Sequence, residues 1–262
     1  MFDLPRPILI GMVHLPPLPG SPRHELPEAK IVARAVDDAR TLADAGFGAL
    51  MVENFGDTPF VARRVEPVTI ATMGVVAAAV RSAVSLPLGI NVLRNDAQAA
   101  LGVAAAVGAK FVRVNIHLGV AATDQGMIQG RARQTLQLRN RIAPDVSIVA
   151  DVHVKHAVQM SQPDIALAAE ETAYRGLADA LVVSGSTTGR PADQADVRRV
   201  KEAVPDRPIL VGSGVTAETI AVLLAHADGA IVGTAIKLDG RPDNPVDPER
   251  ARALVAAAGY RI

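Results

Sequence analysis

Short apolar runs alternate with longer segments of helical spacing along the whole chain. The runs are too short for helices and rich in valine, isoleucine and leucine, a composition typical of buried strands. There are eight of them, at residues 8–13, 49–52, 88–92, 111–116, 147–152, 180–183, 209–211 and 230–232. Apolar residues recur with helical spacing after each run, at residues 28–44, 67–83, 96–107, 129–142, 164–175, 193–203, 216–225 and 247–257. The pattern therefore predicts eight strand–helix units.

Strict alternation of strands and helices predicts the fold class. It is typical of α/β proteins with a parallel sheet, and eight units favour closure into a (β/α)8 TIM barrel. No linker rich in proline, glycine or serine interrupts residues 1–262, so we expect a single domain. An open doubly wound sheet is the alternative, because Gly212-Ser-Gly-Val-Thr-Ala217 fits the dinucleotide pattern G-x-G-x-x-A. The next strand ends in Gly233-Thr234 instead of the Asp or Glu that hydrogen-bonds the ribose hydroxyl of a dinucleotide. No nucleotide-cofactor motif is therefore predicted.

Connections between the predicted elements differ in length. Helix-to-strand connections are brief, as at Ala45-Gly46, whereas several strand-to-helix connections are long. The long ones cover residues 14–27, 54–67, 117–128, 185–192 and 234–247. In a barrel they all lie at the carboxyl ends of the strands, where TIM-barrel active sites are built. We therefore expect a functional site on that face.

Composition limits the partners and the location of the protein. The 27 Lys and Arg residues balance 27 Asp and Glu residues, so no basic field favours nucleic acid or an anionic membrane. The absence of cysteine excludes disulfides, thiolate metal ligands and cysteine nucleophiles. The N-terminal residues do not resemble a secretory signal, and no apolar run approaches the roughly 20 residues of a transmembrane helix. We expect a cytoplasmic protein without a transmembrane segment, and homo-oligomerisation stays open.

Two glycine turns near the end of the chain predict an anion site. The sequence predicts that residues 208–215 and 229–234 are buried strands that turn into loops, each closed by glycine and a hydroxyl residue. Glycine lets backbone N–H groups approach an anion, and turns after the last two strands form the phosphate site of many TIM barrels. The predicted phosphate-binding residues are Gly212, Ser213, Gly214, Gly233 and Thr234. The predicted partner is a small phosphorylated molecule.

Polar residues gather at the predicted strand ends. Those with acid–base chemistry are the catalytic candidates, namely His14, Glu53, Asn115, Asp151, His153 and Lys155. Those that could contact substrate are Asn54, Asn91, His117, Ser184, Ser186 and Thr187. Strand alternation places Asp151, His153 and Lys155 on one side if the strand stays extended. A salt bridge that closes the barrel mouth is the alternative role for Asp151 with His153.

A cofactor is not fixed by the sequence. Glu53, Asp151 and His153 are the main candidates for ligands of a divalent metal, but no closely spaced histidine pair accompanies them. Lys155 has two interpretations, as a buried Schiff-base lysine or as a loop residue with its charge in water. The presence of a metal therefore stays open.

Several long motifs resemble the BtpA/SgcQ family. They cover residues 11–22, 52–60, 89–96, 111–115 and 150–156, and continue through 184–189 to 211–214. The resemblance implies a TIM barrel of the ribulose-phosphate-binding type. The family takes its name from a factor for photosystem I biogenesis at the thylakoid surface, and its SgcQ branch is linked to sugar metabolism. That branch has been labelled a nucleoside triphosphatase, but no Walker A pattern occurs here.

Two classes of function follow from the residues and the resemblance together. The first is an enzyme that acts on a small phosphorylated metabolite, a sugar phosphate or a nucleotide-like compound, by acid–base or metal-assisted chemistry. Isomerase, lyase and hydrolase reactions all fit. The second is a non-catalytic biogenesis or stability factor that associates peripherally with a membrane complex such as photosystem I. Convergent carboxylates and imidazoles at a barrel mouth favour the enzyme.

Overall fold

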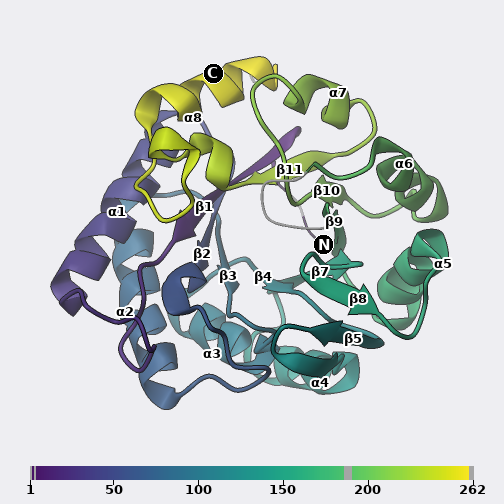
Figure 1. Cartoon of the computed structure of the whole chain (residues 1–262), viewed down its shortest axis with the longest axis horizontal. Coiled ribbons are helices and arrows are strands. Elements are labelled where there is room, and N and C mark those ends of the chain that lie inside the picture. The colour runs from purple at the N-terminus through teal and green to yellow at the C-terminus, as the bar shows by residue number, and fades with distance from the viewer. Residues whose placement is uncertain (1, 3, 186–190, 260–262) are drawn as a thin grey trace.

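Eight parallel strands close into a barrel in the computed structural model, which describes residue 2 and residues 4–185 and 191–259 (Figure 1). The ring follows the order β1-β11-β10-β9-β7-β4-β3-β2, and β1 pairs with both β2 and β11. The strands are β1 (Ile8–His14), β2 (Ala49–Glu53), β3 (Leu88–Asn91), β4 (Phe111–Val114), β7 (Ser147–Val152), β9 (Ala180–Val183), β10 (Ile209–Val211) and β11 (Gly229–Val232). The predicted TIM barrel is confirmed.

Helices surround the barrel (Figure 1). They are α1 (Glu28–Asp44), α2 (Pro67–Ala83), α3 (Ala97–Val107), α4 (Ala132–Ile142), α5 (Ile165–Glu170), α6 (Gln194–Ala203), α7 (Ile220–Leu224) and α8 (Pro248–Ala257). Short turns add η1 (Phe55–Asp57), η2 (Glu171–Arg175, a π-helix that extends α5), η3 (Thr234–Ile236) and η4 (Leu238–Gly240). Aspartates begin four helices, because the side chains of Asp96, Asp164, Asp193 and Asp247 accept backbone N–H groups of the first turn.

A small antiparallel sheet, formed by loops at the carboxyl ends of the barrel strands, was not predicted. Its order is β6 (Gly126–Gln129), β5 (Val120–Thr123) and β8 (Ala157–Gln159). The helix expected at 129–142 therefore begins later, at Ala132. These strands have three or four residues, and β8 joins β5 from a different loop. Such short pairings across distant segments leave no periodic signal in the sequence.

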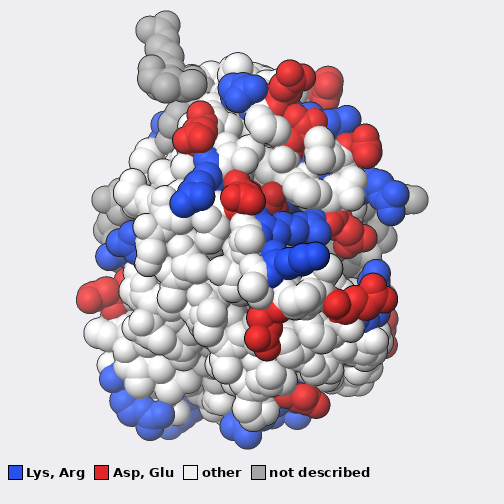
Figure 2. All heavy atoms as spheres, turned by 90° about the vertical axis from the view of Figure 1, so that its left-hand side faces the viewer, with Lys and Arg blue, Asp and Glu red and all other residues white. Residues whose placement is uncertain are grey.

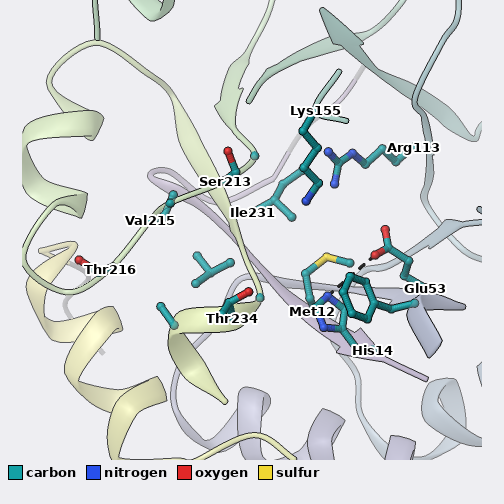
Figure 3. A pocket seen from close by; sticks show the side chains of 16 residues that line it. Met12, His14, Glu53, Arg113, Lys155, Ser213, Val215, Thr216, Ile231 and Thr234 are labelled. Carbon is teal, nitrogen blue, oxygen red and sulfur yellow. Dashed lines mark ion pairs between the residues drawn. The ribbon is translucent and has the colours of Figure 1, made fainter. Parts of the chain in front are cut away.

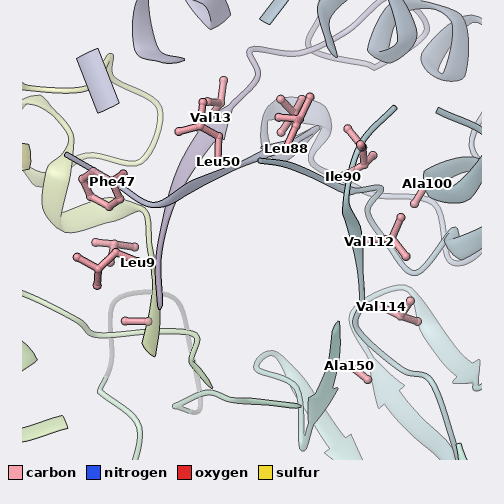
Figure 4. Packing of buried hydrophobic residues seen from close by; sticks show 14 of the residues in the cluster. Leu9, Val13, Phe47, Leu50, Leu88, Ile90, Ala100, Val112, Val114 and Ala150 are labelled. Carbon is pink, nitrogen blue, oxygen red and sulfur yellow. The ribbon is translucent and has the colours of Figure 1, made fainter. Parts of the chain in front are cut away.

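The hydrophobic core has two layers, because successive strand residues point to opposite sides. Leu9 and Leu50 point outward against the helices (Figure 4), whereas Ile10 and Phe111 belong to a cluster inside the barrel. Gly89 of β3 leaves room for the Phe111 ring, since a Cβ there would lie 2.1 Å from a ring carbon. Side chains thus fill the barrel interior. A ligand site is confined to the mouth.

The loop after β11 is tied to α1 by a buried ion pair. The Lys237 Nζ donates to a carboxylate oxygen of Asp38 at 2.8 Å, and both side chains are buried. The other carboxylate oxygen accepts the Val246 N–H at 2.7 Å. Asp38 therefore holds both ends of this loop, which carries one of the two glycine turns.

Charged side chains of both signs are interspersed on the surface that Figure 2 shows. This agrees with the balanced composition, because no extended patch of one sign covers that face. Among the described residues, no helix combines the length and the apolarity needed to span a membrane.

Candidate functional site

A hollow lies at the barrel mouth (Figure 3). One side is formed by residues 212–216 and 233–235, which follow β10 and β11. The other side carries His14, Glu53, Arg113 and Lys155. The structure thus brings the two glycine turns together and sets them opposite ionisable side chains.

The glycine turns present unpaired backbone N–H groups. Among the described residues, no acceptor is paired with the amides of Gly214, Val215, Thr234 and Ala235, and all four residues line the hollow. Gly214 has φ 66°, a conformation that favours glycine. Backbone N–H groups that converge on a concave surface are typical of anion sites.

The three other residues of the predicted phosphate site are held by close contacts or a hydrogen bond. A Cβ at Gly212 would lie 2.4 Å from a Val182 methyl carbon, so only glycine fits there without movement. The Ser213 hydroxyl accepts the Gly185 N–H at 2.6 Å and so links the loops after β9 and β10. A Cβ at Gly233 would lie 2.9 Å from Cε1 of His14. The turn after β11 therefore packs closely on the histidine.

His14 and Glu53 lie beside each other at the ends of β1 and β2. The His14 Nδ1 lies 3.1 Å from the carbonyl oxygen of Pro242, which can only accept, so Nδ1 carries the proton. The Nε2 faces a Glu53 oxygen at 3.9 Å, and Phe55 stacks on the imidazole at 4.3 Å. Asn91 donates to the other Glu53 oxygen. Burial, together with the charge of Lys237, holds the pKa of His14 well below its ordinary value.

The lowered pKa of His14 predicts acid sensitivity. The unfolded chain takes up a proton near pH 6.5 that the folded protein excludes. Stability is therefore full above this pH and is lost as pH falls, by up to about 1.4 kcal/mol per pH unit from this group. In urea unfolding at pH 7.5 and 5.5, His14→Gln should reduce the difference between the two values. His117, whose pKa burial also lowers, still contributes in that variant.

The control for this prediction is His24→Gln, because His24 is exposed. This variant should keep the wild-type pH dependence. A His14→Gln protein with the same pH dependence as wild type would contradict the assignment of a neutral, buried imidazole.

Asp151 is engaged in a buried ion pair. Its carboxylate accepts from Nε and Nη2 of Arg113 at 2.9 and 3.1 Å, and from the Asn115 side-chain amide at 2.8 Å. The side chains of Arg113 and Asp151 are 3% and 0% exposed. This geometry matches the salt-bridge alternative, although Arg113 and not His153 is the partner. Asp151 holds Arg113 at the edge of the hollow.

The expectation that Asp151, His153 and Lys155 share one side is wrong. Strand β7 ends at Val152, and His153 has φ 53°, so the chain turns before alternation can continue. The His153 Nε2 lies 2.8 Å from the Gln162 carbonyl oxygen, outside the main hollow. Lys155 does reach the hollow. Its amine forms no hydrogen bond or ion pair with the described residues, and burial, then Arg113, lowers its pKa.

The three metal candidates do not come together. Glu53 is bonded to Asn91, Asp151 to Arg113, and His153 to a backbone carbonyl. Within the described ranges, no cluster of three or more His, Asp or Glu residues is suited to hold a metal ion.

The predicted substrate-contact residues lie in different places, and most of them are engaged elsewhere. Asn54 holds its own loop, because its amide bonds to both backbone groups of Leu93 and to Asp57. His117 bonds to the Gly176 carbonyl away from the hollow. The Ser184 hydroxyl is buried and has no hydrogen-bond partner among the residues that the structure describes, and it lies near the position that a Cβ at Gly212 would take. Ser186 and Thr187 lie outside the described residues.

Sequence reasoning missed Arg113, Arg94, Phe55 and Met12. Arg113 interrupts the apolar segment Phe-Val-Arg-Val-Asn, two residues before Asn115. Alternation puts the two on one face, so the signal that marked Asn115 could have found Arg113 as well. Arg94, in the loop after β3, and the two apolar residues gave no signal that distinguishes them from loop or core.

Comparison with known proteins places the chain in a family. The model of the BtpA family matches residues 6–259. An uncharacterised protein from Thermococcus kodakarensis is 51% identical over 98% of this chain and 97% of its own length. The Photosystem I biogenesis protein BtpA of Synechocystis sp. is 41% identical over 98% of this chain and 89% of its own.

Solved structures agree with the fold. Phosphoribosyl anthranilate isomerase from Thermus thermophilus superposes with a TM-score of 0.60, and the match covers 96% of this chain and 98% of that one. The sequence identity is 12%, so this likeness shows the fold alone. The match to the family model and the relatives, over nearly the whole length, shows that the chain belongs to the BtpA family.

Proposed function

We propose that the protein is an enzyme that binds a small phosphorylated metabolite at the barrel mouth and catalyses a proton transfer between this metabolite and side chains of the site. The observation that carries this proposal is the arrangement of one hollow. Unpaired amides of two glycine turns lie on one side, and the His14–Glu53 pair lies on the other. A phosphate held on the first side presents the rest of the molecule to the second.

Phosphate binding is supported by geometry and by charge. Four unpaired N–H groups supply donors that need no side-chain rearrangement. Lys155, across the hollow, adds a positive charge with no ion-pair partner among the described residues. Arg113 adds a second cation whose position Asp151 fixes.

The acid–base chemistry is supported by the state of His14 and Glu53. A neutral imidazole with its proton on Nδ1 leaves the Nε2 lone pair free to accept a proton. Glu53 is held by Asn91, which orients one oxygen toward His14. A substrate atom near these groups can lose a proton to Glu53 and regain one at another position. Isomerase and aldolase-type lyase reactions need such a transfer, whereas in a hydrolase Glu53 would take the proton from the attacking water and pass it to the leaving group. Arg113 would stabilise negative charge that develops on a carbonyl oxygen.

The shared fold gives additional, weaker support. The name of the Thermus thermophilus enzyme states a phosphoribosyl compound as its substrate. Because a shared fold alone does not establish function, the proposal rests on the residues of the hollow.

Ala235→Asp tests the phosphate site. Ala235 lines the hollow beside the unpaired amides, so a carboxylate there repels a bound phosphate. We expect the affinity for inorganic phosphate and glycerol 3-phosphate, measured by calorimetry, to fall at least about tenfold. Ala253→Asp, at an exposed position of α8, should bind like wild type. Equal affinity in both variants would refute a phosphate site between the turns.

A second candidate is an assembly factor for a membrane protein complex. The observation that favours it is the name of the Synechocystis relative. Glu53→Gln separates the two functions. If the protein is an enzyme, this variant should lose turnover with its fold intact. If it is an assembly factor, the variant should still support normal photosystem I levels when it is expressed in Synechocystis sp. in place of the relative.

A further inference from the structure

A second hollow adjoins the first at the barrel mouth. The two hollows share Glu53, Phe55, Arg113 and Lys155 in their linings. A single small molecule that passes these four residues therefore reaches both. The side chains that line only the second hollow would contact the end of that molecule that lies away from its phosphate, which we call its far end.

Arg94 is the charged group that distinguishes the second hollow. It lies in the loop after β3 and is only 5% exposed. Its Nη2 donates to the Lys155 carbonyl oxygen at 2.6 Å, and its buried Nε has no hydrogen-bond partner among the described residues. No described carboxylate lies within the 4.0 Å of an ion pair. Burial of a guanidinium without an anion in contact is unfavourable, so a bound anion would stabilise Arg94.

The carboxylates nearby form no ion pair with Arg94 in the part of the chain that the structure describes. Asp151 is already bonded to Arg113. Lys155 also lacks an ion-pair partner among the described residues. Asp124, at the exposed turn between β5 and β6, lines the same hollow but forms no ion pair with Arg94. Glu53 also lines this hollow, and together with Asp124 and Asp151 it acts on Arg94 from beyond ion-pair distance. Arg94 and Lys155 are thus two cations that face the space for the substrate's far end without an ion-pair contact to a described carboxylate.

We propose that the substrate carries a carboxylate, bound by Arg94 and Lys155 in the second hollow, in addition to its phosphate. The substrate class is then a phosphorylated hydroxy or oxo acid, and this inference rests on the proposed function. The planar fork of arginine fits a carboxylate. A carboxylate also suits the site better than a second phosphate, because it carries one negative charge instead of nearly two, and the acidic Glu53 and Asp124 lie in the same lining.

Matched ligand pairs test the inference. Each acid is compared with the alcohol that has CH2OH in place of the carboxylate, so both members keep the phosphate. Because the distance between the two anion sites sets the chain length, three pairs are used. They are 2-phosphoglycolate with 2-hydroxyethyl phosphate, 3-phosphoglycerate with glycerol 3-phosphate, and 4-phosphoerythronate with erythritol 4-phosphate. At constant ionic strength, at least one acid should bind about tenfold or more tightly than its alcohol, the contribution of one charge-assisted hydrogen bond.

Variants identify the residue responsible. Arg94→Gln should bring the preferred acid to the affinity of its alcohol, while the alcohol keeps its wild-type affinity within about twofold. Arg81→Gln, an exposed position on α2, should leave the ratio unchanged. If Arg94→Gln fails to fold, the wild-type ratios and Lys155→Met still decide.

The outcomes separate the two proposals. Acids and alcohols that bind equally would overturn the carboxylate site and leave the phosphate site standing. A preference for the acid that survives both Arg94→Gln and Lys155→Met would overturn the assignment to these residues. Failure of every phosphate ester and of inorganic phosphate to bind would overturn the proposed function, and this inference with it.

Discussion

Asp151→Leu should lower the free energy of unfolding by about 3–5 kcal/mol, because it leaves a buried guanidinium without its anion. The ion pair with Arg113 has two hydrogen bonds, and both side chains are almost fully buried. Asn115 loses its carboxylate partner as well. Urea unfolding followed by circular dichroism measures the loss.

A double-mutant cycle separates the charge from the packing. Arg113→Met in the same chain as Asp151→Leu should recover most of the stability, because an apolar pair replaces the ion pair. Asp145→Leu, at an exposed position just before β7, should change stability by no more than about 0.5 kcal/mol. An Asp151→Leu protein as stable as Asp145→Leu would show that Asp151 does not hold Arg113 in this way.

Gly89→Ala should also destabilise the barrel, by about 1–3 kcal/mol or more, because the added methyl overlaps a ring in the interior. The new Cβ would lie 2.1 and 2.3 Å from two carbons of the Phe111 ring. That ring also packs edge-on against Phe2, with centroids 5.4 Å apart, so it cannot move without disturbing the cluster inside the barrel. Thermal or urea unfolding gives the value.

The chain offers a matched control for this substitution. Gly102 lies inside α3 with nothing within 4 Å of an added Cβ, so Gly102→Ala should stabilise by about 0.5–1 kcal/mol. In a Phe111→Leu background, Gly89→Ala should cost much less than in wild type, since the two ring carbons that overlap most with the added Cβ are gone. An equal cost in both backgrounds would disprove the packing explanation.

The barrel strands were predictable because each is a short apolar run between turn signals. The run at 147–152 coincides with β7, and the others agree within two residues. Burial on both faces makes such strands uniformly apolar, which is a local property that the sequence displays. The small sheet was not predictable in this way, because β8 pairs with β5 across more than thirty residues and both are partly polar.

The site was predicted in part, and the difference is physical. The two glycine turns depend on local backbone conformation, and they do meet at one hollow. His14 and Glu53 end neighbouring strands and are register partners, so topology alone brings them together. His153 itself has a positive φ, and Lys155 follows this turn, which extrapolation of a strand does not anticipate. Arg94 could be assigned to the site only from the structure, in which the loop after β3 meets the loop after β7.

The ring is sealed between its first and last strands, β1 and β11, and the Lys237–Asp38 pair makes a second link between the same ends. A ribosome releases β1 long before β11. The edge of β1 that β11 later covers therefore stays unpaired through most of synthesis, and an unpaired edge invites association with other chains. Ribosome-bound intermediates that stop short of residue 229 should accordingly depend on chaperones, and completion of the last strand should end that dependence.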